Sequence, residues 1–313
     1  MSTLSKKLFI SVLTLIVTVG AFAATTFAWF TLGNTATVGK FEGSATAGEG
    51  LEVRIGESGA WTNFISDTQI QGAINTSSFK NFSAITSKDG KTFTKLLVEN
   101  NVVTTKPVED KTDYIEFQLQ FRSVTGGSVH LSGVTFASAA ASAWLNDGNP
   151  FNDALKQPIG GVDSTDRTVV EYISNAARLS VTGETDTVIV EQTAGTNSNV
   201  IGMGEISFGA HSFFKSRFDS TVGSQYDAAY AAAALNLSTT LQAGNINSTT
   251  RPETKVATLS TGTTKFGETQ YHTVTVTVRV WLEGWDANTY NALFNMVLQT
   301  SLAFKKGVDI PSD

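Results

Sequence analysis

The chain contains no cysteine in its 313 residues, so it can form neither a disulfide nor a thiolate metal site. Its stability must come from the size of its core or from neighbouring subunits. Proline is also scarce, with five residues, and no proline-rich linker marks a domain boundary. Charged residues make up only 16%, the net charge is −6, and no stripe of lysine and arginine is present. We therefore expect no nucleic-acid partner.

Motifs for catalysis or metal binding are missing as well. The three histidines (His130, His211 and His272) lie far apart, and none has a metal-ligand spacing. No H-E-x-x-H, G-x-S-x-G or Walker-type sequence occurs. A lone histidine on a strand, such as His130 or His272, is expected to be an ordinary surface residue. The oxygen-rich residues 146–153 lack the ordered calcium-loop pattern and its closing glutamate. We therefore expect a protein that is not an enzyme and has no metal or cofactor.

Two further patterns near the C-terminal end have a structural and a functional interpretation. Glu283 and Asp286 are the best candidates for paired carboxylates, but Asp286 is explained as the cap of a short helix over residues 287–294. Trp281 falls on the polar side of its expected strand, where an exposed indole could stack on a sugar. Packing of Trp281 under a loop, or against a neighbouring subunit, is the favoured interpretation.

What the chain does have is a long uncharged start, with no charged residue between Lys7 and Lys40. Residues 8–23 follow two lysines and end on Ala-Phe-Ala, which is typical of a secretory signal peptide. The apolar stretch continues to Thr31 and so reaches the roughly 20 residues that a membrane-spanning helix needs. Residues 1–28 are thus either a cleaved signal peptide or a retained anchor helix. In both cases the rest is expected to be secreted or at the cell surface, after contact with the membrane through this segment.

The remainder, residues 29–313, is expected to be all-β with a few short helices. In residues 272–283 the side chains of Val274, Val276, Val278, Val280 and Leu282 share one face, which predicts a strand packed on a core. Residues 114–122 alternate in the same way. Weaker strand candidates are residues 51–55, 93–98, 129–136, 177–182, 187–192 and 296–304. This spacing predicts a two-sheet β-sandwich.

Helix is expected at only a few places in this region. Residues 226–235 contain strong helix formers, residues 287–294 follow the Asp286 cap, and residues 137–145 are expected to add a turn of helix. Residues 56–92 and 193–268 are rich in Ser, Thr, Asn and Gly, which predicts long loops. A long insertion is expected around residues 137–268.

The segment just after the anchor has the chemistry of a strand. Residues 29–41 are uncharged up to Lys40, and the side chains of Phe30, Leu32, Ala36 and Val38 lie on one side. This segment either forms the first strand of its own subunit or adds to the sheet edge of the next one. A head-to-tail exchange of the second kind does not close and builds a fibre.

Residues 24–38 resemble the signal exit and first strand of the TasA/camelysin-like secreted proteins of Gram-positive bacteria, in which an alanine precedes an aromatic pair. Residues 174–182 and 278–287 are similar to a broader group of such surface proteins. The resemblance implies a jelly-roll subunit that polymerises with itself into extracellular fibres. It implies cleavage between Ala28 and Trp29 by a dedicated signal peptidase, whereas the Ala-Phe-Ala pattern predicts cleavage after Ala23. The protease activity ascribed to camelysin-like members finds no metal motif here.

The leading hypothesis is therefore an exported structural subunit of a surface filament or biofilm fibre. Its donor strand would use the assembly residues Trp29, Phe30, Leu32, Ala36 and Val38. The alternative is a membrane-tethered cell-surface module that binds a glycan or another envelope component. A hydrolase is the third and least favoured class.

Overall fold

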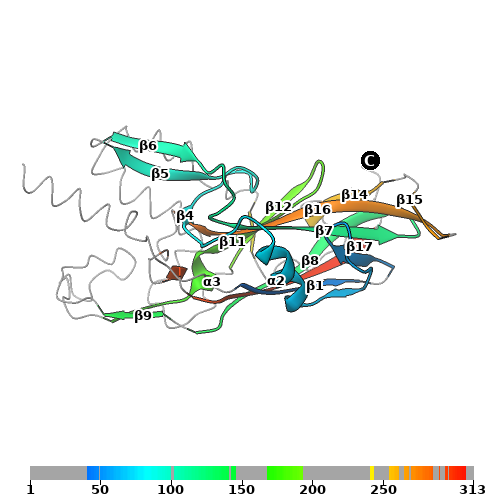
Figure 1. The fold of residues 1–313 in the computed structure, drawn as a ribbon, viewed down its shortest axis with the longest axis horizontal. Helices are drawn as coiled ribbons and strands as arrows, with labels where there is room; N and C mark the ends of the chain where they lie inside the picture. The colour runs from blue at the N-terminus through cyan, green and yellow to red at the C-terminus, as the bar shows by residue number, and fades with distance from the viewer. Residues whose placement is uncertain are drawn as a thin grey trace, which may run out of the picture.

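The computed structural model describes residues 41–48, 50–99, 102–140, 142–145, 168–192, 240–242, 254–260, 264–267, 269–284, 289, 293–294 and 296–307. These residues form mostly β-strands, arranged in two large and two small sheets (Figure 1). Two short helices accompany the strands in this part of the chain, α2 (Asp67–Asn75) and α3 (Ile173–Ala176).

One large sheet has five strands in the order β14-β8-β17-β1-β3. Their bounds are β14 Lys255–Leu259, β8 Gly127–Ser138, β17 Leu298–Gly307, β1 Phe41–Ala47 and β3 Phe64–Ile65. Most neighbours in this sheet are antiparallel, but β1 runs parallel to β17. The N-terminal and C-terminal described strands therefore lie side by side.

The other large sheet has eight strands, six of them in the order β13-β12-β11-β16-β7-β2, with β15 and β4 also paired to β16. Their bounds are β13 Thr240–Gln242, β12 Thr187–Glu191, β11 Ala177–Thr182, β16 Thr269–Glu283, β7 Ile115–Ser123, β2 Glu52–Ile55, β15 Thr264–Phe266 and β4 Ala84–Ile85. The small sheets are the pairs β5 (Thr94–Glu99) with β6 (Val102–Pro107), and β9 (Ser142–Leu145) with β10 (Thr168–Glu171).

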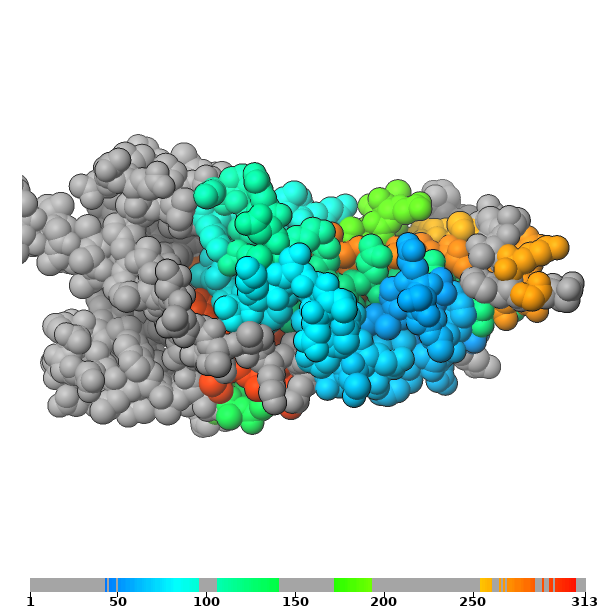
Figure 2. Space-filling view, in the orientation of Figure 1, coloured from blue at the N-terminus to red at the C-terminus, as the bar shows by residue number. Residues whose placement is uncertain are grey.

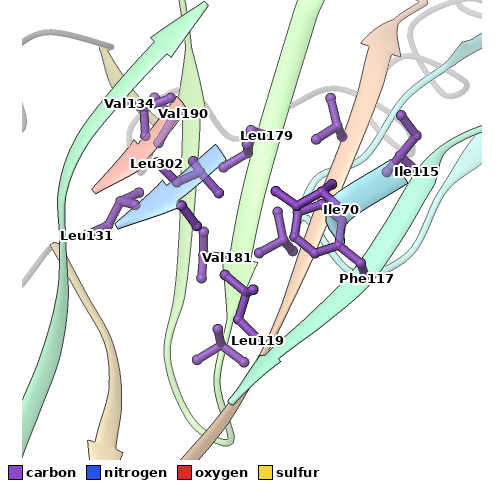
Figure 3. Packing of buried hydrophobic residues seen from close by; sticks show 14 of the residues in the cluster. Ile70, Ile115, Phe117, Leu119, Leu131, Val134, Leu179, Val181, Val190 and Leu302 are labelled. Carbon is purple, nitrogen blue, oxygen red and sulfur yellow. The ribbon is translucent and has the colours of Figure 1, made fainter. Parts of the chain in front are cut away.

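The two large sheets face each other over one hydrophobic core. The rings of Phe121 in β7 and Phe304 in β17 lie 4.8 Å apart between their centroids, so the sheets are in direct contact. Figure 3 shows Leu131 and Leu302 of the five-stranded sheet among side chains of the eight-stranded sheet such as Leu179. The alternating apolar residues of β7 and β16 thus pack inward, as a strand with one buried face requires.

Most of the expected strands are present. The alternation in residues 272–283 and 114–122 is confirmed by β16 and β7, and the six weaker candidates are confirmed by β2, β5, β8, β11, β12 and β17. The expected turn of helix at residues 137–145 is wrong, because β8 continues to Ser138 and β9 begins at Ser142. Ala137 pairs there with Gln299 of β17, and this pairing overrides the helix propensity of the alanines.

Other expectations concern the long loops and the N-terminus. Helix α2 lies within residues 56–92, which were expected to be loop, and β11, β12 and β14 of residues 137–268 belong to the large sheets. The helix expected at 226–235 lies outside the described residues, as does most of the one at 287–294. Residues 1–28 are outside them too; a search of the described part found no helix long and apolar enough to cross a membrane.

A second, smaller apolar cluster lies on the outer face of the eight-stranded sheet. It contains Ile85, Phe93, Tyr114, Ile189 and Trp281, and the residues between α2 and β7 supply three of these five. A tight turn holds this outer layer down. The hydroxyl of Ser180 in β11 donates to the carbonyl of Gly90 at 2.6 Å. Gly90 has a φ of +67°, and a Cβ there would lie 2.6 Å from the Cβ of Ser180. The turn therefore requires glycine.

Candidate functional site

The two edges of the five-stranded sheet differ. At β14, the turn between β11 and β12 crosses the strand so closely that a Cβ on Gly183 would overlap the carbonyl oxygen of Val256. At the other side, β1 pairs with β17 over seven residues, from Phe41 with Leu298 to Ala47 with Phe304. The outer side of β1 pairs with only the two residues of β3. The N-terminal half of β1 is therefore a sheet edge within the described part of the chain.

The main chain of β1 shows which groups face this edge. The N–H of Ala47 donates to the carbonyl of Asn63 at 2.9 Å, and the N–H of Gly43 donates to Oδ1 of Asp67 at 3.0 Å. Main-chain groups alternate in direction along a strand, so those of Phe41, Gly43, Ala45 and Ala47 all face away from β17. The last β3 pair is Ala45 with Ile65. Phe41 and Gly43 lie beyond it.

Helix α2 covers the space between the two sheets next to this edge. Its start is a capping box, in which the N–H of Ser66 donates to Oε1 of Gln69 at 2.9 Å. Ile70 and Ile74 are four residues apart and buried in the core, so they anchor one face of the helix. Figure 2 shows the α2 segment at the surface beside the blue residues of β1 and β2. Asp67 in the first turn is thereby placed against β1.

The edge also presents an apolar side chain to solvent. Phe64 of β3 is 48% exposed; among the large hydrophobic side chains whose exposure the structure describes, Val124 is the other strongly exposed one, at 58%. On the core side, β1 buries the small residues Gly43 and Ala45. We refer to Phe41–Ala47, Phe64–Ile65 and Asp67 as the β1 edge. It combines outward-facing main-chain groups with an exposed aromatic ring, which are the features that strand addition uses.

The assembly residues named from the sequence (Trp29, Phe30, Leu32, Ala36 and Val38) lie outside the described residues, and so does the Ala28–Trp29 cleavage site. Of the segment 29–41 only Phe41 is described, as the first residue of β1. Sequence reasoning missed the β1 edge because it treated residues 56–92 as loop. The Ser66-x-x-Gln69 capping box ahead of Ile70 and Ile74 was the signal that could have revealed α2.

Trp281 is a buried packing residue. It is fully buried, its ring meets that of Phe93 edge-on at 5.2 Å between centroids, and its Nε1 donates to Oε2 of Glu283 at 3.1 Å. Packing under a loop is confirmed, and stacking of this indole on a sugar is wrong. Glu283 is itself fully buried, so it is not placed for acid–base work on an external substrate. Its proposed partner Asp286 lies outside the described residues.

His130 departs from the expectation of a surface residue, because it is only 4% exposed. Its Nε2 lies 2.8 Å from the hydroxyl of Ser128, and its Nδ1 lies 3.0 Å from that of Thr254. Both ring nitrogens are thus satisfied by hydroxyl groups inside the fold. A serine next to a histidine in a buried strand, without access for a substrate, is a packing arrangement.

Two titratable groups of the outer layer have a shifted pKa. Burial alone would raise the pKa of Asp89, but hydrogen bonds from the N–H groups of Thr92 and Lys91 and from nearby hydroxyls outweigh it and hold this pKa below its usual value. Burial raises the pKa of Tyr114, with a further contribution from Glu116. Asp89 closes a tight turn and Tyr114 packs in the outer cluster. Both shifts therefore have a structural cause.

Arginine side chains stacked on aromatic rings link three strands of the eight-stranded sheet. The guanidinium groups of Arg54 and Arg122 each lie 4.5 Å from the ring centroid of Trp61, and Arg122 also lies over Tyr271 at 4.2 Å. Arg122 forms an ion pair with Glu52 at 2.7 Å. These contacts tie β2, β7 and β16 together.

No group of three or more His, Cys, Asp or Glu residues that could hold a metal ion was found in the part of the chain that the structure describes. Searches against protein-family models, curated proteins and solved structures found no match. The resemblance to TasA/camelysin-like proteins therefore stays a prediction.

Proposed function

We propose that this chain is an exported structural subunit of an extracellular filament or biofilm fibre, with a jelly-roll-like sandwich as its body. One observation carries the proposal most directly. Among the described strands β1 comes first, and its N-terminal half lies at a sheet edge and not within the sheet. In the sequence, the uncharged residues 29–39 come just before this edge strand, and only Lys40 separates them from it.

The assembling segment is residues 29–38, which follow cleavage between Ala28 and Trp29. Phe30, Leu32, Ala36 and Val38 would fill an apolar groove, while the main chain continues a neighbour's sheet. The donor lies ahead of Phe41 and the acceptor lies elsewhere on the next copy, so the two contacting surfaces differ. Such a contact is heterologous and propagates into a fibre. The partner of this protein is then a second copy of itself.

Two substitutions in the donor segment test this proposal. Leu32→Asp places a carboxylate on the apolar side of the donor strand, where the desolvation of a charge costs several kcal/mol. We expect the association constant to fall by about a hundredfold or more, since each 1.4 kcal/mol is a factor of about ten. The matched control is Thr31→Asp, which places the same charge on the opposite side.

Fibres are counted by negative-stain microscopy of the exported protein, and secretion is measured in parallel. Loss of fibres in Leu32→Asp but not in Thr31→Asp supports the donor strand. Equal fibre formation in both variants would show that this segment is not the donor. N-terminal sequencing is expected to find Trp29 as the first residue. An intact Met1 on a membrane-bound monomer would contradict the proposal.

A further inference from the structure

We infer that α2 acts as a guard on the β1 edge. Its Asp67 accepts the hydrogen bond of the Gly43 N–H, which is the main-chain donor that a strand from a second copy must use. This hydrogen bond must break before assembly. The inference rests on the proposed function, because it names the acceptor and the control of the same assembly. It is carried by the contacts of β1 and α2.

The first step is the hydrogen bond between β1 and α2. The N–H of Gly43 faces outward, and its acceptor is a side-chain oxygen of Asp67 at 3.0 Å. In a continued sheet a carbonyl of the next strand would take this place. The outward groups of Ala45 and Ala47 are engaged by β3 and Asn63. Asp67 therefore extends the cover of the edge from Ala45 to Gly43.

The second step is the charge. A carboxylate placed at a sheet edge discourages pairing with another chain, because the added strand must displace it and leave it beside its own main-chain carbonyls. The capping box and the buried Ile70 and Ile74 hold α2 in position, so Asp67 is presented at a defined place. On this edge the guard is one side-chain hydrogen bond, from the Gly43 N–H to Asp67, and β3 stays in place beside it. An incoming strand that forms several main-chain bonds can replace it.

The third step is the occupant, which we assign to residues 29–38 of a second copy. This segment is as long as the β1 edge requires, since β1 has seven residues. It contains no carboxylate that Asp67 would repel. Its apolar side chains match the exposed Phe64.

Cysteine cross-linking can locate the acceptor, because the natural chain has no cysteine. Full-length Leu32→Cys and Phe64→Cys variants are mixed, oxidised mildly and analysed by peptide mapping of the disulfide-linked species. The matched control mixes Leu32→Cys with Val124→Cys, since Val124 is the other strongly exposed apolar side chain. We expect a disulfide between positions 32 and 64 of different copies and at least about tenfold less linkage to position 124, because a disulfide needs the two Cα atoms within about 7 Å.

Substitution of Asp67 tests whether the guard limits the rate of assembly. Asp67→Ala deletes the acceptor of the Gly43 N–H, and we expect the polymerisation rate, followed by light scattering, to rise about tenfold or more for the loss of a charge-assisted hydrogen bond. Thr68→Ala, at the next and exposed position of α2, is the matched control and should assemble like the natural chain. Asp67→Asn keeps an acceptor oxygen and should lie between the two.

The outcomes separate the two proposals. Fibres that form with no disulfide between positions 32 and 64 of different copies, or an Asp67→Ala variant that assembles at the natural rate, overturn the guarded edge and leave the filament function standing. A link between positions 32 and 64 that forms only when both substitutions are in the same chain overturns it as well, because the segment is then its own subunit's strand. A chain that forms no polymer in any variant overturns the filament function itself. If Asp67→Ala fails to fold, the cross-link and Asp67→Asn decide.

Discussion

Replacement of Trp281 by alanine is the sharpest test of how the fold is layered. The indole is fully buried between β16 and the outer layer, with Phe93 edge-on against it. Its N–H donates to the buried carboxylate of Glu283. Truncation removes a large apolar side chain from a place that is enclosed on all sides, and it deletes one hydrogen bond of a buried charge.

The expected cost follows from these two losses. Truncation of a buried Trp to Ala costs about 3–5 kcal/mol. A lost hydrogen bond to a charged group adds about 1 kcal/mol or more. We therefore expect Trp281→Ala to lower the free energy of unfolding by about 4 kcal/mol or more. Trp281→Phe keeps most of the ring and loses the donor, so it should cost about 2 kcal/mol.

Urea unfolding followed by far-UV circular dichroism measures these changes, with the slope of each transition compared between variants. The control is Val124→Ala, which removes an exposed apolar side chain and should change stability by less than about 0.5 kcal/mol. A cost below about 1 kcal/mol for Trp281→Ala would refute the buried outer layer, because that is the value expected of a surface side chain. It would also reopen a surface role for this indole.

Three further outcomes follow from the same packing. In Gly183→Ala the new methyl group overlaps the carbonyl of Val256, so the hairpin must shift, and thermal melts should show a loss of about 2 kcal/mol. Arg178 and Glu191 form a buried ion pair at 2.7 Å, so Glu191→Gln should lower the free energy of unfolding in urea by about 3–5 kcal/mol. Replacement of both residues by apolar ones should recover most of this loss. A loss below about 1 kcal/mol in Glu191→Gln would contradict the burial of the pair. The lowered pKa of Asp89 means that its contribution to stability is present above the ordinary carboxyl pKa of about 4 and is lost as the pH falls through the folded-state value. Asp89→Asn should therefore be less stable than the natural chain at pH 7, and this difference should disappear in melts at strongly acidic pH.

The strands were the most predictable part of the fold. The alternation of Val274, Val276 and Val278 indicated both the strand and its buried face, since side chains alternate with a period of two. Helix α2 was missed although its capping box is visible in the sequence, because its nine residues include five polar ones and a glycine and so give only a weak apolar pattern. Only half of the candidate site could be predicted from the sequence. The uncharged segment that we propose as the donor is a sequence feature, but the acceptor that we propose for it depends on a helix and a two-residue strand that no periodicity reveals.

Trp281 shows where local pattern stops being informative. Alternation correctly assigned it to the face opposite the core valines, yet that face is covered here by the outer layer. Whether a strand's second face meets water depends on residues far along the chain, such as Phe93, and not on the strand itself.

The sequence by itself determined that the chain is built of strands, which face of the main ones is apolar, and that an uncharged, strand-like segment precedes them. Only the tertiary structure decided that β1 runs parallel to β17, that the turn between β11 and β12 lies against β14, and that the N-terminal half of β1 is a sheet edge beside Asp67. The reason is physical. Side-chain alternation is a local property, whereas strand order and sheet edges come from main-chain pairing between segments as distant as Phe41 and Leu298, which no local pattern encodes.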